Sequence, residues 1–453
     1  MASTRAPSGT NVAADMLGGS VEVEMSGLVQ GYDELRLRLD RSRGSRYRLL
    51  AATHFAEATV EFEIPAAELG VAGVGPGSNP SRGQLATASL GLNDAKRLGE
   101  ALFESLFHGS VRDIYRDALA DARRRHRGLR IMLCLSGSPE LCEVPWEYLF
   151  DGSHFLATSP LTPVVRYLDL PRRSRTLRVS PPLRLLGIIS NPTDYRQLNV
   201  DEERQNLEHA LASVLGTQAV ELHWLSRPTL PALLNALRTN TFHGLHFIGH
   251  GMYDVGSDKG ALLFEDEGGW ARPVTGDQLG LILQDFSSLR LAVLNACEGA
   301  RSSRHDPFSG VAGALIQRDV PAVIAMQFEI SDDSAITFAA SFYEALAAGA
   351  GVDASVAAAR LSMFANHTEN IEWGKPVLFM RVADAQLFDV REPPMTSRDA
   401  MDDRTSARDA SSLRMDALAL LGRWRRLLGE STRQRRGFPK LDRRFEASPA
   451  PWC

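Results

Sequence analysis

The prediction of fold and site rests on two short stretches, His246-Phe247-Ile248-Gly249-His250-Gly251 and Leu291-Ala292-Val293-Leu294-Asn295-Ala296-Cys297-Glu298-Gly299. Each begins with a compact apolar run, at residues 245–248 and 291–294, and ends in polar residues beside glycine. Such runs are typical of buried strands in a parallel sheet. A helical apolar pattern at residues 274–286 predicts a right-handed strand–helix–strand crossover between them. Both runs would then end at the same edge of the sheet, where open α/β sheets carry their sites.

His250 and Cys297 follow these two predicted strands. An imidazole beside a thiol supplies a base and a nucleophile, because the thiolate is the form that attacks a carbonyl carbon. A free cysteine is more often a small buried hydrophobe. Cys297, however, has a histidine expected at the same edge and is followed by Glu298-Gly299. The two residues therefore predict a cysteine peptidase.

The residues around this pair resemble those of the CHAT family, caspase-like bacterial proteins related to caspases, separase and gingipains. Cys297 follows His250 by 47 residues, and caspases carry their catalytic histidine about 50 residues before the cysteine. The resemblance covers roughly residues 90–390, although the tetratricopeptide array common in the family is absent. Its further motifs are Val144-Pro145-Trp146-Glu147-Tyr148-Leu149, Ser159-Pro160-Leu161-Thr162-Pro163-Val164-Val165-Arg166-Tyr167, Phe308-Ser309-Gly310-Val311-Ala312, Val320-Pro321-Ala322-Val323-Ile324-Ala325-Met326-Gln327, Ser331-Asp332-Asp333-Ser334-Ala335 and Gly374-Lys375-Pro376.

The resemblance implies a role for each residue of the pair. His250 would be the general base and Cys297 the nucleophile, and the backbone N–H groups of Gly251 and Cys297 would receive the oxyanion. No cofactor is expected. The family's associations imply a regulated bacterial defence or signalling protease that acts on protein substrates under an activating protein partner. The alternative is a catalytically silent scaffold that binds protein partners, against which the presence of both His250 and Cys297 argues.

Substrate preference is expected to come from the loop after the predicted strand at residues 322–326. In related caspase-like peptidases this segment helps to line the pocket for the residue before the scissile bond (P1). Here it contains three carboxylates, Glu329, Asp332 and Asp333, which favour a basic P1 residue. The alternative is that Ser331 caps a helix whose first turn holds the two aspartates, but this leaves Glu329 unexplained.

Three histidines, His243, His246 and His250, form an H-x2-H-x3-H pattern that could indicate a metal site. On a strand, residues 246 and 250 share a face while residue 243 points to the other. No nearby cysteine or carboxylate set completes four zinc ligands. The sequence therefore predicts no metal, and His246 is interpreted as a buried, hydrogen-bonded histidine that supports the loop.

The composition is that of an ordinary soluble protein, with 44% hydrophobic and 23% charged residues among 453. The net charge of −5 gives no reason to expect nucleic acid as a partner. No apolar stretch reaches the length of a membrane span, and the first 14 residues lack the apolar core of a signal peptide. The four cysteines show neither a metal-like CxxC nor a dense disulfide pattern. These features predict a cytoplasmic protein.

Three regions are expected along the chain. Residues 1–88 alternate apolar and polar side chains near residues 21–25, 35–39, 47–51 and 59–64, which predicts a small β-rich module and a linker. Residues 89–390 predict an α/β peptidase domain with a caspase-like, mostly parallel sheet covered by helices. It would begin with a helix capped by Asn93 and interrupted near residues 108–110, and its last strand, residues 377–380, would close the sheet. Residues 391–453 predict a flexible basic tail with one amphipathic helix at residues 413–428.

Overall fold

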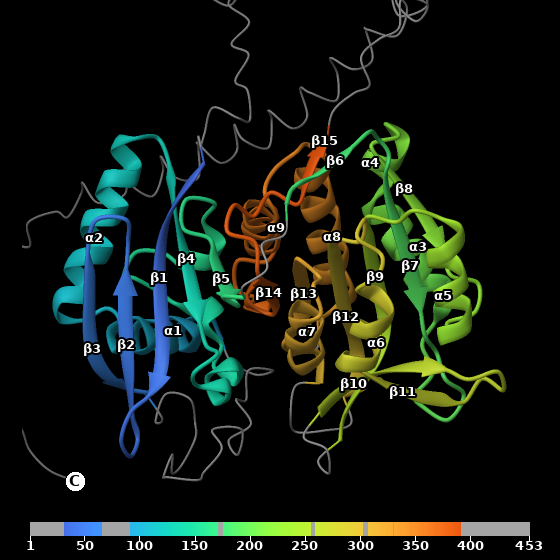
Figure 1. Cartoon of the computed structure of the whole chain (residues 1–453), viewed down its shortest axis with the longest axis horizontal. Coiled ribbons are helices and arrows are strands. Elements are labelled where there is room, and N and C mark those ends of the chain that lie inside the picture. The colour runs from blue at the N-terminus through green and yellow to red at the C-terminus, as the bar shows by residue number, and fades with distance from the viewer. Residues whose placement is uncertain are drawn as a thin grey trace, which may run out of the picture. The chain divides into compact units, whose positions relative to one another are not determined.

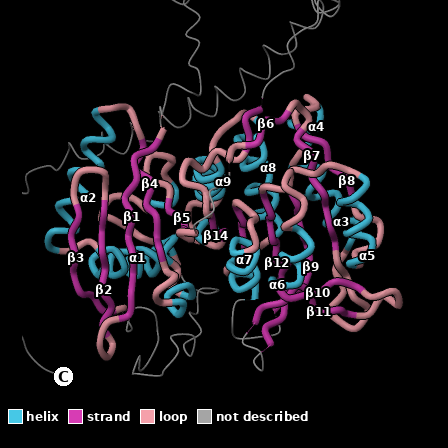
Figure 2. Tube along the Cα trace, in the orientation of Figure 1, coloured by secondary structure: helices cyan, strands magenta, loops and turns pink. Residues whose placement is uncertain are grey.

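A computed structural model describes residues 31–65, 91–170, 175–254, 259–301, 307–328 and 330–390. All of them lie within one compact unit, Val29–Pro393. Figures 1 and 2 show that this unit is a long sheet with helices packed against it. The predicted strand near residues 21–25 and the predicted tail helix at residues 413–428 lie outside the described residues.

The middle of the sheet is parallel, as predicted. Its strands follow the spatial order β8-β7-β9-β12-β13, and each pairs in parallel with the next. The two apolar runs became β9 and β12, and β13 is buried along its whole length. The strands are β7 (Leu183–Ile189), β8 (Val220–Trp224), β9 (Gly244–Asp254), β12 (Leu291–Arg301) and β13 (Ala322–Met326).

Helices cover both faces of these strands. The chain moves one way along the sheet from β7 to β8 through α3, and the other way from β9 to β13 through α6 and α7. Right-handed crossovers therefore place α3 on one face and α6 and α7 on the other. The helices are α3 (Val200–Ala210), α4 (Ala212–Gly216), α5 (Leu230–Thr239), α6 (Gly276–Leu283), α7 (Pro307–Gln317), α8 (Asp332–Ala347) and α9 (Val352–Asn366).

The connection between β9 and β12 contains more than the predicted helix. It first forms an antiparallel hairpin of β10 (Lys259–Glu265) and β11 (Ala271–Thr275), in which Val274 pairs with Leu262. The predicted helix start at residue 274 was therefore wrong, because Val274 belongs to a strand. Thr275 ends that strand and caps α6, its hydroxyl accepting the backbone N–H of Gln278 at 3.3 Å.

The N-terminal strands join the same sheet. β1, β2 and β3 are antiparallel, as the alternation predicted, and β1 pairs in parallel with β4. α1 begins at Leu92, so the predicted cap at Asn93 was wrong. The predicted interruption is present, because α1 ends at Leu106 and α2 begins at Gly109, whose φ of 51° favours glycine. The elements are β1 (Tyr32–Arg41), β2 (Arg46–Ala52), β3 (Glu57–Glu63), α1 (Leu92–Leu106), α2 (Gly109–Arg124), β4 (Gly128–Cys134) and β5 (Val164–Tyr167).

The prediction that the strand at residues 377–380 closes the sheet was wrong. This strand is β14 (Pro376–Met380). It is an inner strand, antiparallel to β13 on one side and parallel to β5 on the other. Only Phe379↔Arg166 and Met380↔Tyr167 pair β14 with β5. Backbone pairing along this β14–β5 junction, called the seam below, is therefore short. The chain then forms β15 (Phe388–Val390), which pairs with β6 (Leu177–Val179) in a separate small sheet.

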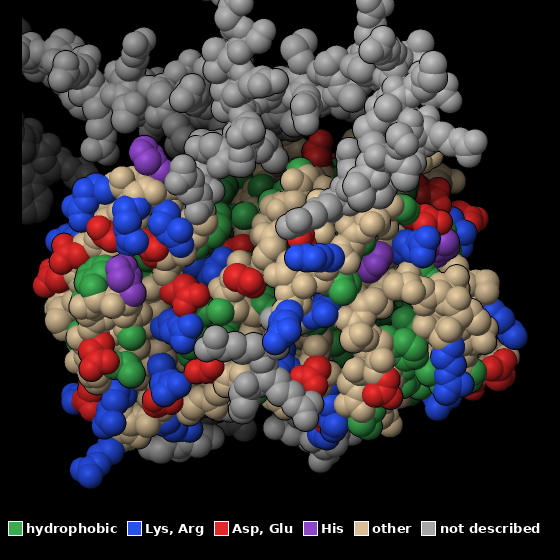
Figure 3. Space-filling view, turned by 45° about the horizontal axis from the view of Figure 1, so that its top comes forward, with side chains coloured by type: hydrophobic (Ala, Val, Ile, Leu, Met, Phe, Trp, Pro, Cys, Tyr) green, Lys and Arg blue, Asp and Glu red, His purple; other side chains and the backbone are tan. Residues whose placement is uncertain are grey.

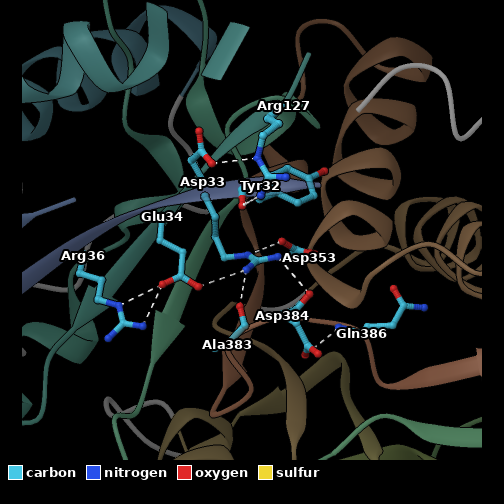
Figure 4. A network of polar contacts seen from close by, with 10 residues as sticks. Tyr32, Asp33, Glu34, Arg36, Arg127, Asp353, Ala383, Asp384 and Gln386 are labelled. Carbon is cyan, nitrogen blue, oxygen red and sulfur yellow. Dashed lines mark hydrogen bonds and ion pairs between the residues drawn. The ribbon is translucent and has the colours of Figure 1, made fainter. Parts of the chain in front are cut away.

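Buried ion pairs reinforce this seam. The Arg130 guanidinium of β4 donates from Nε to Asp353 Oδ2 of α9 at 2.6 Å, and also donates to the carbonyls of Ala383 and Asp384 (Figure 4). The side chains of Arg130 and Asp353 are 3% and 0% exposed. A buried charge needs such partners, so this contact ties β4 to α9 and to the segment after β14.

Charges on the surface are mixed in sign. On the face shown in Figure 3, acidic and basic side chains lie interspersed. Exposed ion pairs on the surface include Arg38 with Asp169 and Arg46 with Glu63. Among the described residues, no helix is long and apolar enough to cross a membrane.

Removing one partner of the buried pair should destabilise the fold strongly. Asp353→Ala removes the buried partner of Arg130 and leaves its charge only the longer pair with Glu34 at 3.8 Å, which should cost about 3–5 kcal/mol of unfolding free energy in urea titrations. Arg38→Ala is the matched control, because its pair with Asp169 is over half exposed and should cost under about 1 kcal/mol. Equal losses in the two variants would contradict a special role for the Arg130–Asp353 contact.

Candidate active site

Residues 250 and 297 directly follow the last pair of the continuous register between β9 and β12. The parallel register runs from Leu291↔Gly244 to Ala296↔Gly249. His250 and Cys297 are the next residues on each strand, and adjacent strands lie about 4.8 Å apart. The register shifts directly after Ala296↔Gly249, so that Arg301 is opposite Gly251. For residues 296–301 the structure describes the backbone only.

The His250 ring is buried and oriented by a backbone carbonyl. The side chain is 1% exposed, and Nε2 lies 2.7 Å from the carbonyl oxygen of Arg196 in the loop after β7. A carbonyl oxygen only accepts, so Nε2 carries the hydrogen and Nδ1 of the neutral ring is left as the acceptor. The Tyr195 ring packs nearby, with its centroid 5.8 Å from that of His250. The loop after β7 therefore fixes the orientation of the His250 ring.

The loop after β7 and the end of β9 meet where the strand order reverses. β7 lies between β8 and β9, so the chain leaves it in one direction and returns on its other side. Open α/β sheets form crevices at such switch points, beyond the carboxyl ends of the strands. His250 occupies this position.

A hollow lies on the same face of the sheet as His250, between α3 and α8. His246 and Ile248 of β9 line it, and strand alternation puts them on one face with His250. Asn295 of β12 also lines it, and its Oδ1 is buried with no hydrogen-bond partner among the described residues. An unpaired buried acceptor is costly.

The predicted substrate residues have different places. Asp332 and Asp333 are both exposed in the first turn of α8, but only Asp332 lines the hollow. Glu329 lies outside the described residues. The sequence reasoning missed Glu203 and Asn206 of α3 and Asn295 of β12, which line the hollow. Only Asn295 carried a local signal, as the residue two positions before Cys297.

The capping alternative for Ser331 is correct only in part. Ser331 precedes α8 and both aspartates are in its first turn, but the Ser331 side chain makes no capping bond. Its hydroxyl donates to Glu372 instead. Burial raises the pKa of Glu372, but hydrogen bonds from Lys375, Ser331 and Ser334 outweigh it and lower the pKa to about 2. An ionised carboxylate thus anchors the segment that leads into α8.

A second buried cluster holds the other end of that segment. Gln327 donates from Nε2 to the carbonyl of Gly374 at 2.7 Å and to Glu147 Oε2 at 3.1 Å. Arg166 pairs with the same carboxylate at 2.8 Å, and the Arg166 and Glu147 side chains are 1% and 0% exposed. These four residues come from four of the motifs quoted above. In this structure the motifs fix Gln327, where the segment between β13 and α8 begins.

The other two histidines are bonded within the protein. His246 is buried with Nδ1 2.9 Å from the Tyr343 hydroxyl, as the interpretation of a buried, hydrogen-bonded histidine predicted. His243 accepts the Arg184 backbone N–H at Nδ1. Burial lowers the pKa of each from 6.5 to about 4, with the Arg184 charge contributing at His243. In the part of the chain that the structure describes, no group of three His, Cys, Asp or Glu side chains could hold a metal ion.

Comparison with known proteins identifies the family. The CHAT domain model matches residues 96–417, so this chain belongs to the CHAT domain family. One similar structure is the Saccharomyces cerevisiae separase–securin complex, at 11% identity and a TM-score of 0.42; the match covers 77% of this chain and 30% of the separase-complex chain. Another is the Drosophila initiator caspase Dronc, at 11% identity and a TM-score of 0.29, covering 50% of this chain and 96% of that one. No curated protein matches.

The buried His246 should make stability depend on pH. Its pKa is about 4 when folded and 6.5 when exposed, so the unfolded chain binds the proton first as the pH falls. Stability should be unaffected by this group above pH 6.5 and fall by about 3 kcal/mol down to pH 4.

This dependence can be measured by urea titration between pH 7 and pH 4. His246→Gln should lose less stability than wild type over that interval. The control His209→Gln, at an exposed position on α3, should follow the wild type. Parallel curves for wild type and His246→Gln would contradict the assignment.

Proposed function

We propose that this protein is a cysteine endopeptidase that cleaves protein substrates through His250 and Cys297. The observation that carries the proposal is the β9–β12 register, which makes these residues the next positions after Ala296↔Gly249. The Arg196 carbonyl adds support, because it leaves Nδ1 of His250 as the proton acceptor. Residues 89–390 would form the peptidase domain.

The proposed reaction follows acyl transfer through a thiolate. His250 Nδ1 takes the thiol proton, and the Cys297 thiolate attacks the scissile carbonyl carbon. The imidazolium keeps its Nε2–H bond to the Arg196 carbonyl, which stabilises the positive charge. The backbone N–H groups of Gly251 and Cys297 would stabilise the oxyanion. His250 then gives its proton to the leaving amine, and water hydrolyses the acyl-enzyme with His250 as base.

The hollow between α3 and α8 is the proposed pocket for a basic P1 side chain. Two carboxylates, Glu203 and Asp332, and the Asn295 side chain line it. Carboxylates pair with a guanidinium or ammonium through charge-assisted hydrogen bonds, and Asn295 Oδ1 offers a buried acceptor. The sequence adds Glu329 to this proposed set. An acidic P1 side chain would face like charges and is disfavoured.

The family resemblance extends the proposal to a biological role. The associations of the CHAT family imply regulated proteases of bacterial defence or signalling, and we propose that this chain is one of them. It would act in the cytoplasm on a protein substrate, after activation by a protein partner.

The pair can be tested with a thiol-reactive peptidyl probe carrying arginine at P1. The probe should label wild type and not Cys297→Ala. Cys142→Ala is the matched control and should be labelled, because burial raises the pKa of the Cys142 thiol and keeps it protonated. His250→Ala should lower peptide turnover by about 10²- to 10⁴-fold. Unchanged labelling of Cys297→Ala, or a wild type that neither reacts nor turns over peptide, would favour the silent scaffold.

The neighbouring aspartates allow a matched test of specificity. In a fluorogenic library varied at P1, wild type should rank arginine and lysine above aspartate, leucine and alanine. Asp332→Asn and Asn295→Ala should each reduce that preference about tenfold, since a lost contact to a desolvated charge costs about 1–3 kcal/mol. Asp333→Asn should leave the ranking unchanged because Asp333 does not line the hollow. An apolar or acidic preference in wild type would refute the pocket and leave the peptidase proposal standing.

A further inference from the structure

The loop from Asn191 to Leu198 carries the carbonyl that orients His250. It connects β7 to α3 and forms neither helix nor strand, and the Arg196 and Gln197 side chains are exposed. Nevertheless it places the Arg196 oxygen 2.7 Å from Nε2 of a buried ring. Orientation of a base depends on such contacts to within a fraction of an ångström. The position of the Arg196 carbonyl therefore requires contacts that fix the conformation of this loop.

Asn191 closes the loop at its base. Its Oδ1 accepts the Leu198 backbone N–H at 2.8 Å, and its Nδ2 donates to the Leu198 carbonyl at 3.2 Å. One amide thus fixes both polar groups of a residue seven positions later. Within the loop, Gln197 donates to the carbonyls of Pro192 at 2.7 Å and Tyr195 at 3.0 Å. The Arg196 carbonyl is held between these fixed points.

The β10–β11 hairpin supports the loop from outside. Glu265 of β10 accepts the Asn191 backbone N–H at 2.9 Å. The carbonyl of Gly269, in the hairpin turn, accepts the Thr193 N–H at 2.9 Å. Asp194 accepts the Ala271 N–H at 2.7 Å. The hairpin absent from the sequence prediction is therefore the support on which the loop rests.

We propose that Asn191 is a positioning residue for the reaction, acting through the Arg196 carbonyl on the tautomer and orientation of His250. The catalytic consequence rests on the proposed function, in which Nδ1 takes the thiol proton. With the loop closed, Nε2 is bound to the carbonyl and Nδ1 is free of hydrogen. With the loop open, the ring adopts the Nδ1–H tautomer as well, which places a hydrogen where the base must accept one.

Asn191→Ala tests this proposal in kinetics. It should lower kcat for a fluorogenic P1-arginine peptide by about 10- to 100-fold and change KM less than about twofold. The matched control is Asn199→Ala, because Asn199 is an asparagine of the same connection between β7 and α3, whose Oδ1 accepts the Glu202 N–H and caps α3. That variant should lose some thermal stability and keep kcat. Equal kcat values for Asn191→Ala and wild type would overturn the proposal.

Imidazole ¹⁵N NMR provides a readout that does not need turnover. The His250 signal, assigned by its loss in His250→Gln, should show a single Nε2–H tautomer in wild type and in Asn199→Ala. Asn191→Ala should show a mixture of tautomers; an unchanged signal would overturn the proposal. An inactive wild type with these NMR results would refute the peptidase function alone. If Asn191→Ala does not fold, Asp194→Ala, which removes an exposed anchor of the same loop, should shift the tautomer in the same direction, and an unchanged signal there would equally overturn the proposal.

Discussion

The parallel register between β9 and β12 is the constraint on which the candidate site depends. A slip of one residue would turn every side chain of one strand to the opposite face. The buried apolar residues of both strands prevent such a slip, because Phe247 and Leu294 would leave one packed layer for the other. With Ala296 opposite Gly249, His250 and Cys297 follow together. Core packing thus fixes the register that ends immediately before His250 and Cys297.

Buried charges link this central sheet to the N-terminal strands. Backbone pairing between β14 and β5 is limited to two residue pairs. Two buried ion pairs add to it: Arg130 of β4 binds Asp353 of α9, and Arg166 of β5 binds Glu147. Each is costly to break because its partner would remain charged in a dry interior. The second contact also includes Gln327, so the N-terminal half helps to shape the segment that leads into α8. This gives the family motifs a physical role in the fold.

The sequence was informative where one local pattern determined the outcome. The apolar runs before His250 and Cys297 predicted buried parallel strands, and alternation predicted β1 to β3. The sequence was less informative where contacts between distant segments determined which strands pair. Nothing local shows that β14 continues the sheet to β5, and the Asp266-Glu267-Gly268-Gly269 turn was overlooked beside the helical pattern that follows it. The Arg196 carbonyl and the Glu203 side chain could not be predicted, because only the folded loop and α3 bring them to the site.

A crystal structure of the protein inactivated by a peptidyl acyloxymethyl ketone with arginine at P1 would test the central claim most directly. The account predicts a covalent bond from Cys297 Sγ to the inhibitor, with Nδ1 of His250 facing that sulfur and Nε2 still bound to the Arg196 carbonyl. The arginine side chain should occupy the hollow between α3 and α8, against Asp332 and Asn295. Attachment at another cysteine, or a His250 ring turned away from Cys297, would contradict the account.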